Sequence, residues 1–290
     1  MKNSIELTDN QIAEIKELAD STRKEMGVYS DVAIADDLLI LLEKKDIIIC
    51  EYPFADGSHT DASITIFEND GEQIVFIGLN SNLYYDEQIF ALAHELFHYQ
   101  TKTGMAFQTD EDVEDEVVER MADRYSAELL LPGVVLRKSI KKTFRGENIN
   151  EINELRILRF VARLQIEWWL PYRSIIIRLF EEGGLSQEKR DALLTIDCRD
   201  ENGSYARIFK SIDPDKFLLL NNKSRKQSIS TSTLEIIIRN FEDGFISEDE
   251  FIKLLDLFDK KPNDFGFVIN AVIDDEELIE FLKDGAADEG

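Results

Sequence analysis

Two histidines and a glutamate in one short segment are the residues of this sequence best suited to chemistry. His94, Glu95 and His98 form the pattern H-E-x-x-H, and the whole chain of 290 residues contains only three histidines. If the segment is helical, the two imidazoles lie on one face, one turn apart, where they can bind a single metal ion. Glu95 then lies beside the ion and can take a proton from a water molecule that the metal activates. The pattern predicts a metal-dependent hydrolytic site, with a pair of histidines that bind no metal as the alternative.

A third ligand is expected from a later helix, because catalytic zinc takes three protein ligands and keeps one position open. Glu119 offers this ligand, since it lies on a predicted helix over residues 110–131, beside an apolar stripe that should face the first helix. Asp123, one turn further on the same face, can accept a hydrogen bond from a ligating histidine and so fix its tautomer. Both acids could instead be surface charges. Three neighbouring acids compete for the ligand position: Glu114, Asp115 and Glu116.

The oxygen that becomes negative during peptide hydrolysis needs a hydrogen-bond donor. His59 and Tyr99 are the candidates. His59 lies in a polar loop, residues 55–61, ahead of a predicted hairpin that could frame the cleft, although an ordinary exposed loop histidine fits the same position. We therefore predict His59 as a second catalytic residue beside Glu95.

The elements that must position these residues form a small α+β core. Thr8 and Gln11 have the form of a capping box and predict a helix over residues 8–26, and Ser30 could cap a second helix. Asp86 is expected to cap the helix that carries the histidines. Three segments have the β-branched or alternating composition of strands, and an Asn-Asp-Gly turn joins the last two: 47–52, 62–67 and 73–79. We expect a three-stranded sheet that packs on the two helices of the motif.

The chain changes in character after Pro132. Between Leu131 and Arg190 the basic residues outnumber the acidic ones, and helices are predicted at 150–165 and 172–182. Helices joined by so short a break resemble a helix-turn-helix unit, although two helices that simply pack together are the plainer interpretation. The rest is predicted to be mixed, with strands at 205–211 and 217–220 and helices at 232–240 and after Ser247. The predicted domains are residues 1–135, a metallopeptidase core; 136–195, a helical region; and 196–290, an acidic C-terminal domain.

Composition excludes several classes of function. The net charge is −26, from 33 basic and 59 acidic residues, which opposes direct binding to DNA, RNA or an anionic membrane surface. The two cysteines, Cys50 and Cys198, belong to no motif and indicate a reducing, cytoplasmic environment. The sequence shows no signal-peptide core and no apolar run long enough to span a bilayer, so we expect neither export nor membrane insertion.

The segments around the motif resemble the ImmA/IrrE family of metallo-endopeptidases. The resemblance is carried by residues 90–99, F-A-L-A-H-E-L-F-H-Y, and by residues 119–132, which begin with E-R-M-A-D and end in a Leu-Leu-x-Pro signature. H-E-x-x-H followed by E-x-x-A-D is typical of gluzincin peptidases. Phe97 stands where the family more often has Gly, which could crowd the metal face, and Asp123 stands where many members have Asn. The similarity covers roughly residues 30–185.

This resemblance implies a zincin-like core that holds one Zn²⁺ ion, or another divalent metal such as Mn²⁺. It also implies a gene-regulatory endopeptidase that cleaves a helix-turn-helix repressor or an antitoxin and thereby derepresses stress or mobile-element genes. The basic helices between Gly133 and Arg190 could dock that protein partner. The alternative is a non-catalytic regulator that binds a transcription factor or toxin and uses the metal only structurally. A direct DNA-binding regulator is a third possibility, and the net charge counts against it.

Overall fold

The chain divides into two compact units, Met1–Ser230 and Thr231–Gly290. The computed structural model describes residues 6–55, 57–58, 60–69, 72–103 and 112–268. Within these ranges no helix combines the length and the apolar character needed to cross a membrane. The predicted domain limits at residues 135 and 195 stay predictions.

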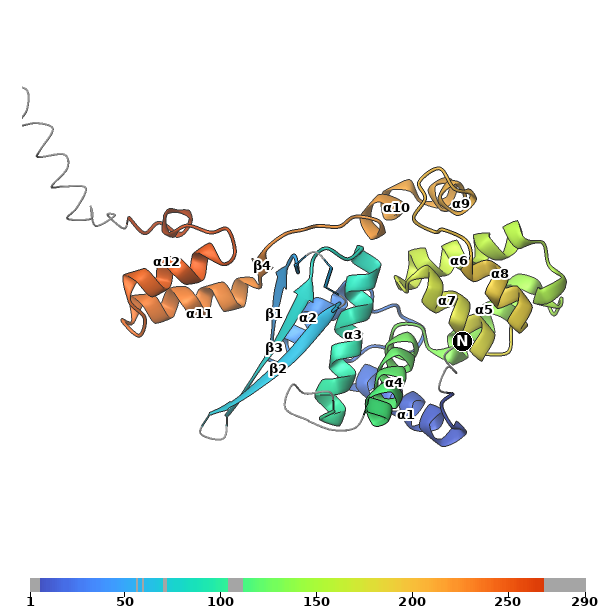
Figure 1. Ribbon diagram of the computed structural model, residues 1–290, viewed down its shortest axis with the longest axis horizontal. Coiled ribbons are helices and arrows are strands. Elements are labelled where there is room, and N and C mark those ends of the chain that lie inside the picture. Colours follow the sequence, from blue (N-terminus) through green and yellow to red (C-terminus); the bar gives the residue numbers. More distant parts are fainter. Residues whose placement is uncertain (1–5, 56, 59, 70–71, 104–111, 269–290) are drawn as a thin grey trace, which may run out of the picture. The chain divides into compact units, whose positions relative to one another are not determined.

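A mixed sheet of four strands forms one layer of the first unit (Figure 1). Its strands are β1 (Ile47–Tyr52), β2 (Ala62–Asn69), β3 (Glu72–Asn80) and β4 (Ser228–Ile229), in the order β2-β3-β1-β4. β2 and β3 form the predicted antiparallel hairpin, and β1 runs parallel to β3. The sequence predicted three strands, whereas β4 adds a fourth that pairs with Cys50 and Glu51 of β1. β2 is therefore an edge strand, and on one side it pairs with no strand among the described residues.

Two helices carry the metal-binding motif and pack on this sheet. α3 (Tyr85–Thr101) lies against β2 and β3, and α4 (Asp112–Leu130) lies beside α3. α1 (Asp9–Glu25) packs on α4, while α2 (Asp37–Glu43) packs on β1 and α3. The buried side of α3 includes Ile89, Leu92 and Leu96, whose spacing of three and four residues is that of an apolar helix face. The predicted α+β architecture is confirmed.

Two predicted helix starts are wrong and one is confirmed. Thr8 and Gln11 form the expected capping box of α1. The second helix begins only at Asp37, because the buried Arg23 guanidinium donates to the carbonyls of Tyr29 and Val32 and holds this segment in turns. The motif helix α3 has Tyr84, not Asp86, as its N-cap.

Asp86 has a different role from the predicted cap. Its carboxylate is fully buried and accepts hydrogen bonds from Gln165 Nε2 and Arg199 Nη2, each at 2.6 Å. The hydroxyl of Tyr205 donates in turn to Gln165 Oε1 at 2.6 Å. The first turn of α3 is thus tied to segments that lie far along the chain.

The region after α4 is helical. Its elements are α5 (Gly133–Phe144), a 3₁₀ turn η1 (Ile149–Glu151), α6 (Glu154–Trp168), α7 (Tyr172–Glu181), α8 (Gln187–Leu194), α9 (Ser204–Ile212) and α10 (Pro214–Leu220). Trp169, with φ of 55°, ends α6, and Pro171 immediately precedes α7. Ile175, Ile176 and Leu179 of α7 are buried, so the second helix of the helix-turn-helix-like pair contributes to a core.

The strands predicted at 205–211 and 217–220 are wrong, because both segments lie in helices. Tyr205 and Phe209 are four residues apart and both are buried on α9, which is the spacing of a helix face. Asp213 then caps α10 by accepting a hydrogen bond from the backbone N–H of Lys216 at 2.8 Å. A short apolar run does not by itself distinguish a strand from a buried helix.

The second unit contains a helical hairpin. α11 (Thr231–Glu242) and α12 (Glu248–Asp256) are followed by a 3₁₀ turn, η2 (Pro262–Phe265). The rings of Phe241 and Phe251 stack with centroids 4.2 Å apart, and Phe267 packs edge-on against both. These contacts join the two helices, which lie where the sequence predicted helices.

Candidate metal centre

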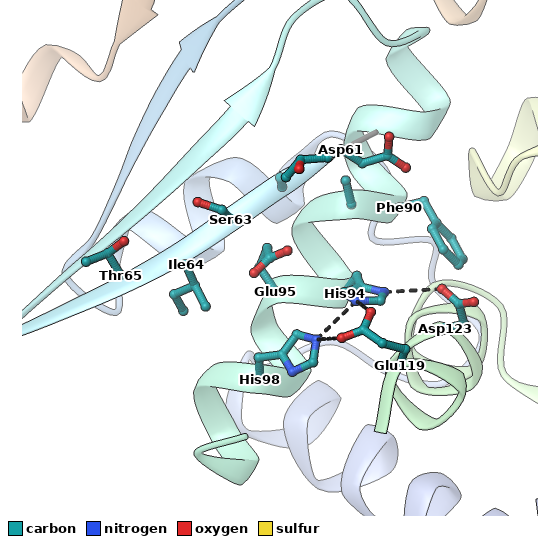
Figure 2. Close-up of a pocket in the computed structure, with 13 residues that line it drawn as sticks. Asp61, Ser63, Ile64, Thr65, Phe90, His94, Glu95, His98, Glu119 and Asp123 are labelled. Atoms are coloured by element: carbon teal, nitrogen blue, oxygen red, sulfur yellow. Dashed lines mark hydrogen bonds and ion pairs between the residues drawn. The ribbon is translucent and has the colours of Figure 1, made fainter. Parts of the chain in front are cut away.

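His94, His98 and Glu119 converge on one point between α3 and α4 (Figure 2). Nε2 of His94 lies 3.1 Å from Nε2 of His98 and 3.1 Å from Oε2 of Glu119. Nε2 of His98 lies 3.5 Å from Oε1 of Glu119. Ligand atoms bonded to a tetrahedral zinc ion at about 2.0–2.2 Å lie roughly 3.3–3.6 Å apart. The spacing of the three side chains therefore fits one ion of this size.

Hydrogen bonds at the opposite ring nitrogens orient both imidazoles. Nδ1 of His94 lies 3.2 Å from Oδ1 of Asp123, and Nδ1 of His98 lies 3.4 Å from Oγ1 of Thr103. An imidazole that donates from Nδ1 presents the lone pair of Nε2 to a metal. Asp123 lies where the sequence predicted such a partner. Thr103 was missed, because it follows the helix and nothing in its spacing marks it.

The charges around His94 favour a cation at this point. Burial alone would lower the pKa of His94, but hydrogen bonds to Asp123 and Glu119 outweigh burial and raise it to about 10. The hydrogen bond from His94 lowers the pKa of Glu119. Burial, together with the positive charge of His94, lowers the pKa of His98. Two carboxylates thus attract one positive charge, which a proton or a metal ion can supply.

Glu95 lies beside the three ligands in the wall of a cavity of about 520 Å³. The cavity lies between β2, which contributes most of residues 60–65, and the helices α3 and α4 (Figure 2). The backbone N–H of Ile64 donates a hydrogen bond to the Glu95 carboxylate. Burial, reinforced by the charge of Glu119, raises the pKa of Glu95 to about 7, although His94 and the Ile64 hydrogen bond act in the opposite direction. Glu95 therefore lies beside the three ligands with a carboxylate that burial makes more basic, as a proton acceptor requires.

The other residues singled out from the sequence lie elsewhere. Glu116 is exposed on α4 and is not part of the cluster. Tyr99 is half-buried against the hydrophobic core and does not line the cavity. Phe97 is buried, with its ring centroid 5.5 Å from that of Tyr125, and it packs edge-on against the ring of His98 with centroids 5.7 Å apart. Three further positions lie outside the described residues or side chains: His59, Glu114 and Asp115.

The hairpin frames the cavity, as its place before the motif helix suggested, but the residues with which it does so were not predicted. Asp61 and Ser63 line the same cavity as the histidines. Burial and the charge of Glu87 raise the pKa of Asp61, while His94 opposes this shift. The sequence indicated these two residues only through the position of the hairpin directly before the motif helix.

Comparison with known families also indicates a metallopeptidase site. Residues 43–165 match the family model of the IrrE N-terminal-like domain, Peptidase_M78. The matched segment contains His94, Glu95, His98, Glu119 and Asp123, and so includes the whole cluster. The matched family and the cluster together indicate a metal ion. No curated protein matches the chain significantly.

Proposed function

We propose that this protein, whose residues 43–165 belong to the ImmA/IrrE family of peptidases, is a zinc-dependent endopeptidase that cleaves a regulatory protein. The observation that carries the proposal is the spacing of the ligand atoms of His94, His98 and Glu119 beside Glu95. Two imidazoles and one carboxylate are a donor set of catalytic zinc, and imidazole suits Zn²⁺ better than Mn²⁺. When bound, the ion supplies Lewis acidity toward a water molecule and toward the carbonyl of the scissile peptide.

The side chains of the site supply the other parts of the reaction. Glu95 accepts the proton of the attacking water and later delivers it to the leaving amine, a role for which its position in the cavity wall beside the three ligands is suited. Asp123 and Thr103 hold the two imidazoles in the tautomer that binds a metal. His59 stays a prediction as the donor to the developing negative oxygen.

The edge strand β2 offers a way to hold the substrate. In the part of the chain that the structure describes, one side of β2 has no strand partner, and β2 forms a wall of the cavity. An extended peptide can pair with such an edge through backbone hydrogen bonds, which are insensitive to side-chain identity. A substrate segment is therefore expected to bind in extended form between β2 and α3.

The nature of the target rests on the family resemblance. We place a helix-turn-helix repressor or an antitoxin in the substrate role, with derepression of stress or mobile-element genes as the result. The exposed side chains of Lys138, Lys141 and Lys142 on α5 suit an acidic surface of such a protein.

The test pairs the purified protein with the repressor or antitoxin encoded beside its gene. Zinc-loaded wild type is expected to cut this partner, and Glu95→Gln is expected to cut it at least about 10³-fold more slowly while keeping its zinc. Glu116→Gln, which changes an exposed acid of α4 outside the cluster, is the matched control. Binding of the partner without cleavage by either protein would instead support a non-catalytic regulator. Equal cleavage by wild type and Glu95→Gln would contradict the proposed role of Glu95.

A further inference from the structure

The cavity beside the metal cluster has one end whose charge is not used by the proposed chemistry. The cavity is lined by residues 60–65 and by Phe90, Ala91, His94, Glu95, His98, Glu119 and Asp123, and no lysine or arginine is among them. Beyond Glu95 and Glu119, two carboxylates remain in the wall, those of Asp61 and Asp123. Asp123 is engaged by Nδ1 of His94. Asp61, which is exposed, is therefore the carboxylate of the wall that is left to act on a bound molecule.

Asp61 is held in place by its backbone and not by its side chain. The N–H of Asn80 donates to the Asp61 carbonyl at 3.0 Å, and Nδ2 of Asn80 donates to the Thr60 carbonyl at 3.3 Å. These bonds fix the chain just before β2 begins at Ala62. The Asp61 carboxylate itself makes no hydrogen bond or ion pair with any residue in the described part of the chain. The strand thus presents a carboxylate without a partner at a fixed position.

The surroundings of Asp61 favour a positive group from outside the protein. The charges of Glu87 and Asp123 act on Asp61 in one direction and that of His94 in the other. Glu87 is paired with Arg199 at 3.0 Å and Asp123 with His94, so neither pair supplies a cation to Asp61. Phe90 is half-buried and lines the same cavity, and Figure 2 shows its ring between Asp61 and Asp123 in this view. An aromatic ring attracts an ammonium or guanidinium group and also packs well against the aliphatic stem of lysine or arginine.

We propose that Asp61 selects a lysine or arginine side chain of the substrate, close to the scissile bond. This inference rests on the proposed peptidase function, because it assigns a subsite of the same cavity. The side chain of the bound peptide packs along Phe90 and places its charge against the Asp61 carboxylate. A glutamate or aspartate at that position meets the carboxylates of Asp61 and Asp123 and is disfavoured.

The test uses the full-length, zinc-loaded protein and a peptide library made by digesting a proteome with chymotrypsin, which leaves internal lysine, arginine, glutamate and aspartate intact. Mass spectrometry of the products gives the residues on both sides of each cut. Wild type is expected to enrich lysine and arginine at one position near the scissile bond. A matched pair of synthetic peptides, with Lys or Gln at that position, then gives the ratio of the two kcat/KM values.

Asp61→Asn is expected to lower this ratio about tenfold, and Asp61→Lys is expected to shift the enrichment to glutamate and aspartate. Glu68→Gln, at an exposed position of β2 outside the cavity, is the matched control and should keep the wild-type ratio. Circular dichroism and zinc content establish that each variant is folded. The Lys peptide should also bind the Glu95→Gln protein more tightly than the Gln peptide does, in a fluorescence anisotropy assay.

The outcomes separate the two proposals. Wild type that cuts no peptide and no partner protein overturns the peptidase function and the subsite with it. Cleavage without a preference for lysine or arginine overturns the subsite alone. An enrichment that is unchanged in Asp61→Lys also overturns it, because the preference would then arise elsewhere.

Discussion

Two polar clusters in the first unit differ in how their charges are balanced. In the first, the fully buried Arg178 donates to Glu128 at 2.6 Å and to Glu182 at 3.2 Å. Arg124 pairs with Glu182 at 3.3 Å and also with Glu181. Each of these carboxylates faces an arginine that the chain itself supplies. This ion cluster, defined by Arg124, Glu128, Arg178, Glu181 and Glu182, joins α4 to α7.

The metal cluster has the opposite arrangement. Its carboxylates, Glu119 and Asp123, have side chains 56% and 53% exposed, and within the described residues no lysine or arginine forms an ion pair with them. Their partners are imidazoles, which bind a proton or a metal as conditions dictate. Where the chain supplies a permanent cation, the acids serve stability. Where it supplies histidines, the positive charge is exchangeable, and the cluster serves binding and chemistry.

The largest expected effect comes from removing the central cation of the ion cluster. Arg178→Met leaves Glu128 buried without its closest partner, which should lower the free energy of unfolding by about 3–5 kcal/mol. Urea denaturation followed by circular dichroism measures the change. Arg137→Met is the control, because Arg137 is half-exposed at the rim and should cost less than about 1 kcal/mol. Equal losses in the free energy of unfolding would show that burial does not determine how much each arginine of this cluster stabilises the fold.

The corresponding change in the metal cluster should affect binding and not folding. Glu119→Gln removes an anionic ligand and is expected to weaken zinc binding more than about 100-fold, since changes to residues that only orient a ligand already cost about 10–100-fold. The unfolding free energy of the metal-free protein should change by less than about 1 kcal/mol, because the side chain is half-exposed. Competition with a chelator measures affinity, with Glu116→Gln as control. Loss of zinc binding in Glu116→Gln but not in Glu119→Gln would contradict the assignment of Glu119 as the third ligand.

The exchangeable charge also predicts how zinc binding depends on pH. His94 holds a proton with a pKa of about 10, and this proton must leave before Nε2 can bind a metal. Because the raised pKa means tighter proton binding, lower pH favours the proton, and zinc affinity should rise about tenfold per pH unit between about pH 6 and 8. Chelator competition at several pH values measures this slope. An affinity independent of pH would show that binding displaces no proton.

The smallest effect is expected from Asp123. Asp123→Asn keeps an oxygen that can accept the hydrogen bond from Nδ1 of His94 but removes the charge, so zinc affinity should fall only about tenfold. The same substitution should reduce the slope of affinity against pH, because it removes one of the two charges that raise the pKa of His94. A loss larger than that of Glu119→Gln would make Asp123 a ligand and not an orienting residue.

The parts of the site that lie on helices could be predicted from the sequence. The helical period alone places His94 beside His98, and Glu119 beside Asp123, so the spacing is sufficient to pair these four residues. Thr103 and Asp61 could not be predicted in the same way. Both lie just outside a regular element, and their positions depend on how loops return to the site.

The errors in the predicted fold have a common physical origin in long-range contacts. The segment after Ser30 has helical spacing, but Arg23 binds its carbonyls. Asp86 is a good capping residue by type, but its carboxylate binds Gln165 and Arg199. The hairpin and the capping box of α1 were predicted correctly because both are determined by residues close in the chain.

The buried Asp86 sets the shortest length of chain that can support the peptidase site. The segment that matches the family ends at Gln165, whereas Arg199 and Tyr205, which complete the network around Asp86, come later. A protein shortened to residues 43–165 would keep every proposed ligand and leave the Asp86 carboxylate without its cation in the first turn of α3. During synthesis this pair cannot form before Arg199 has been made, because Arg199 lies 113 residues beyond Asp86. The contacts of Asp86 are therefore completed only when most of the first unit has already been made.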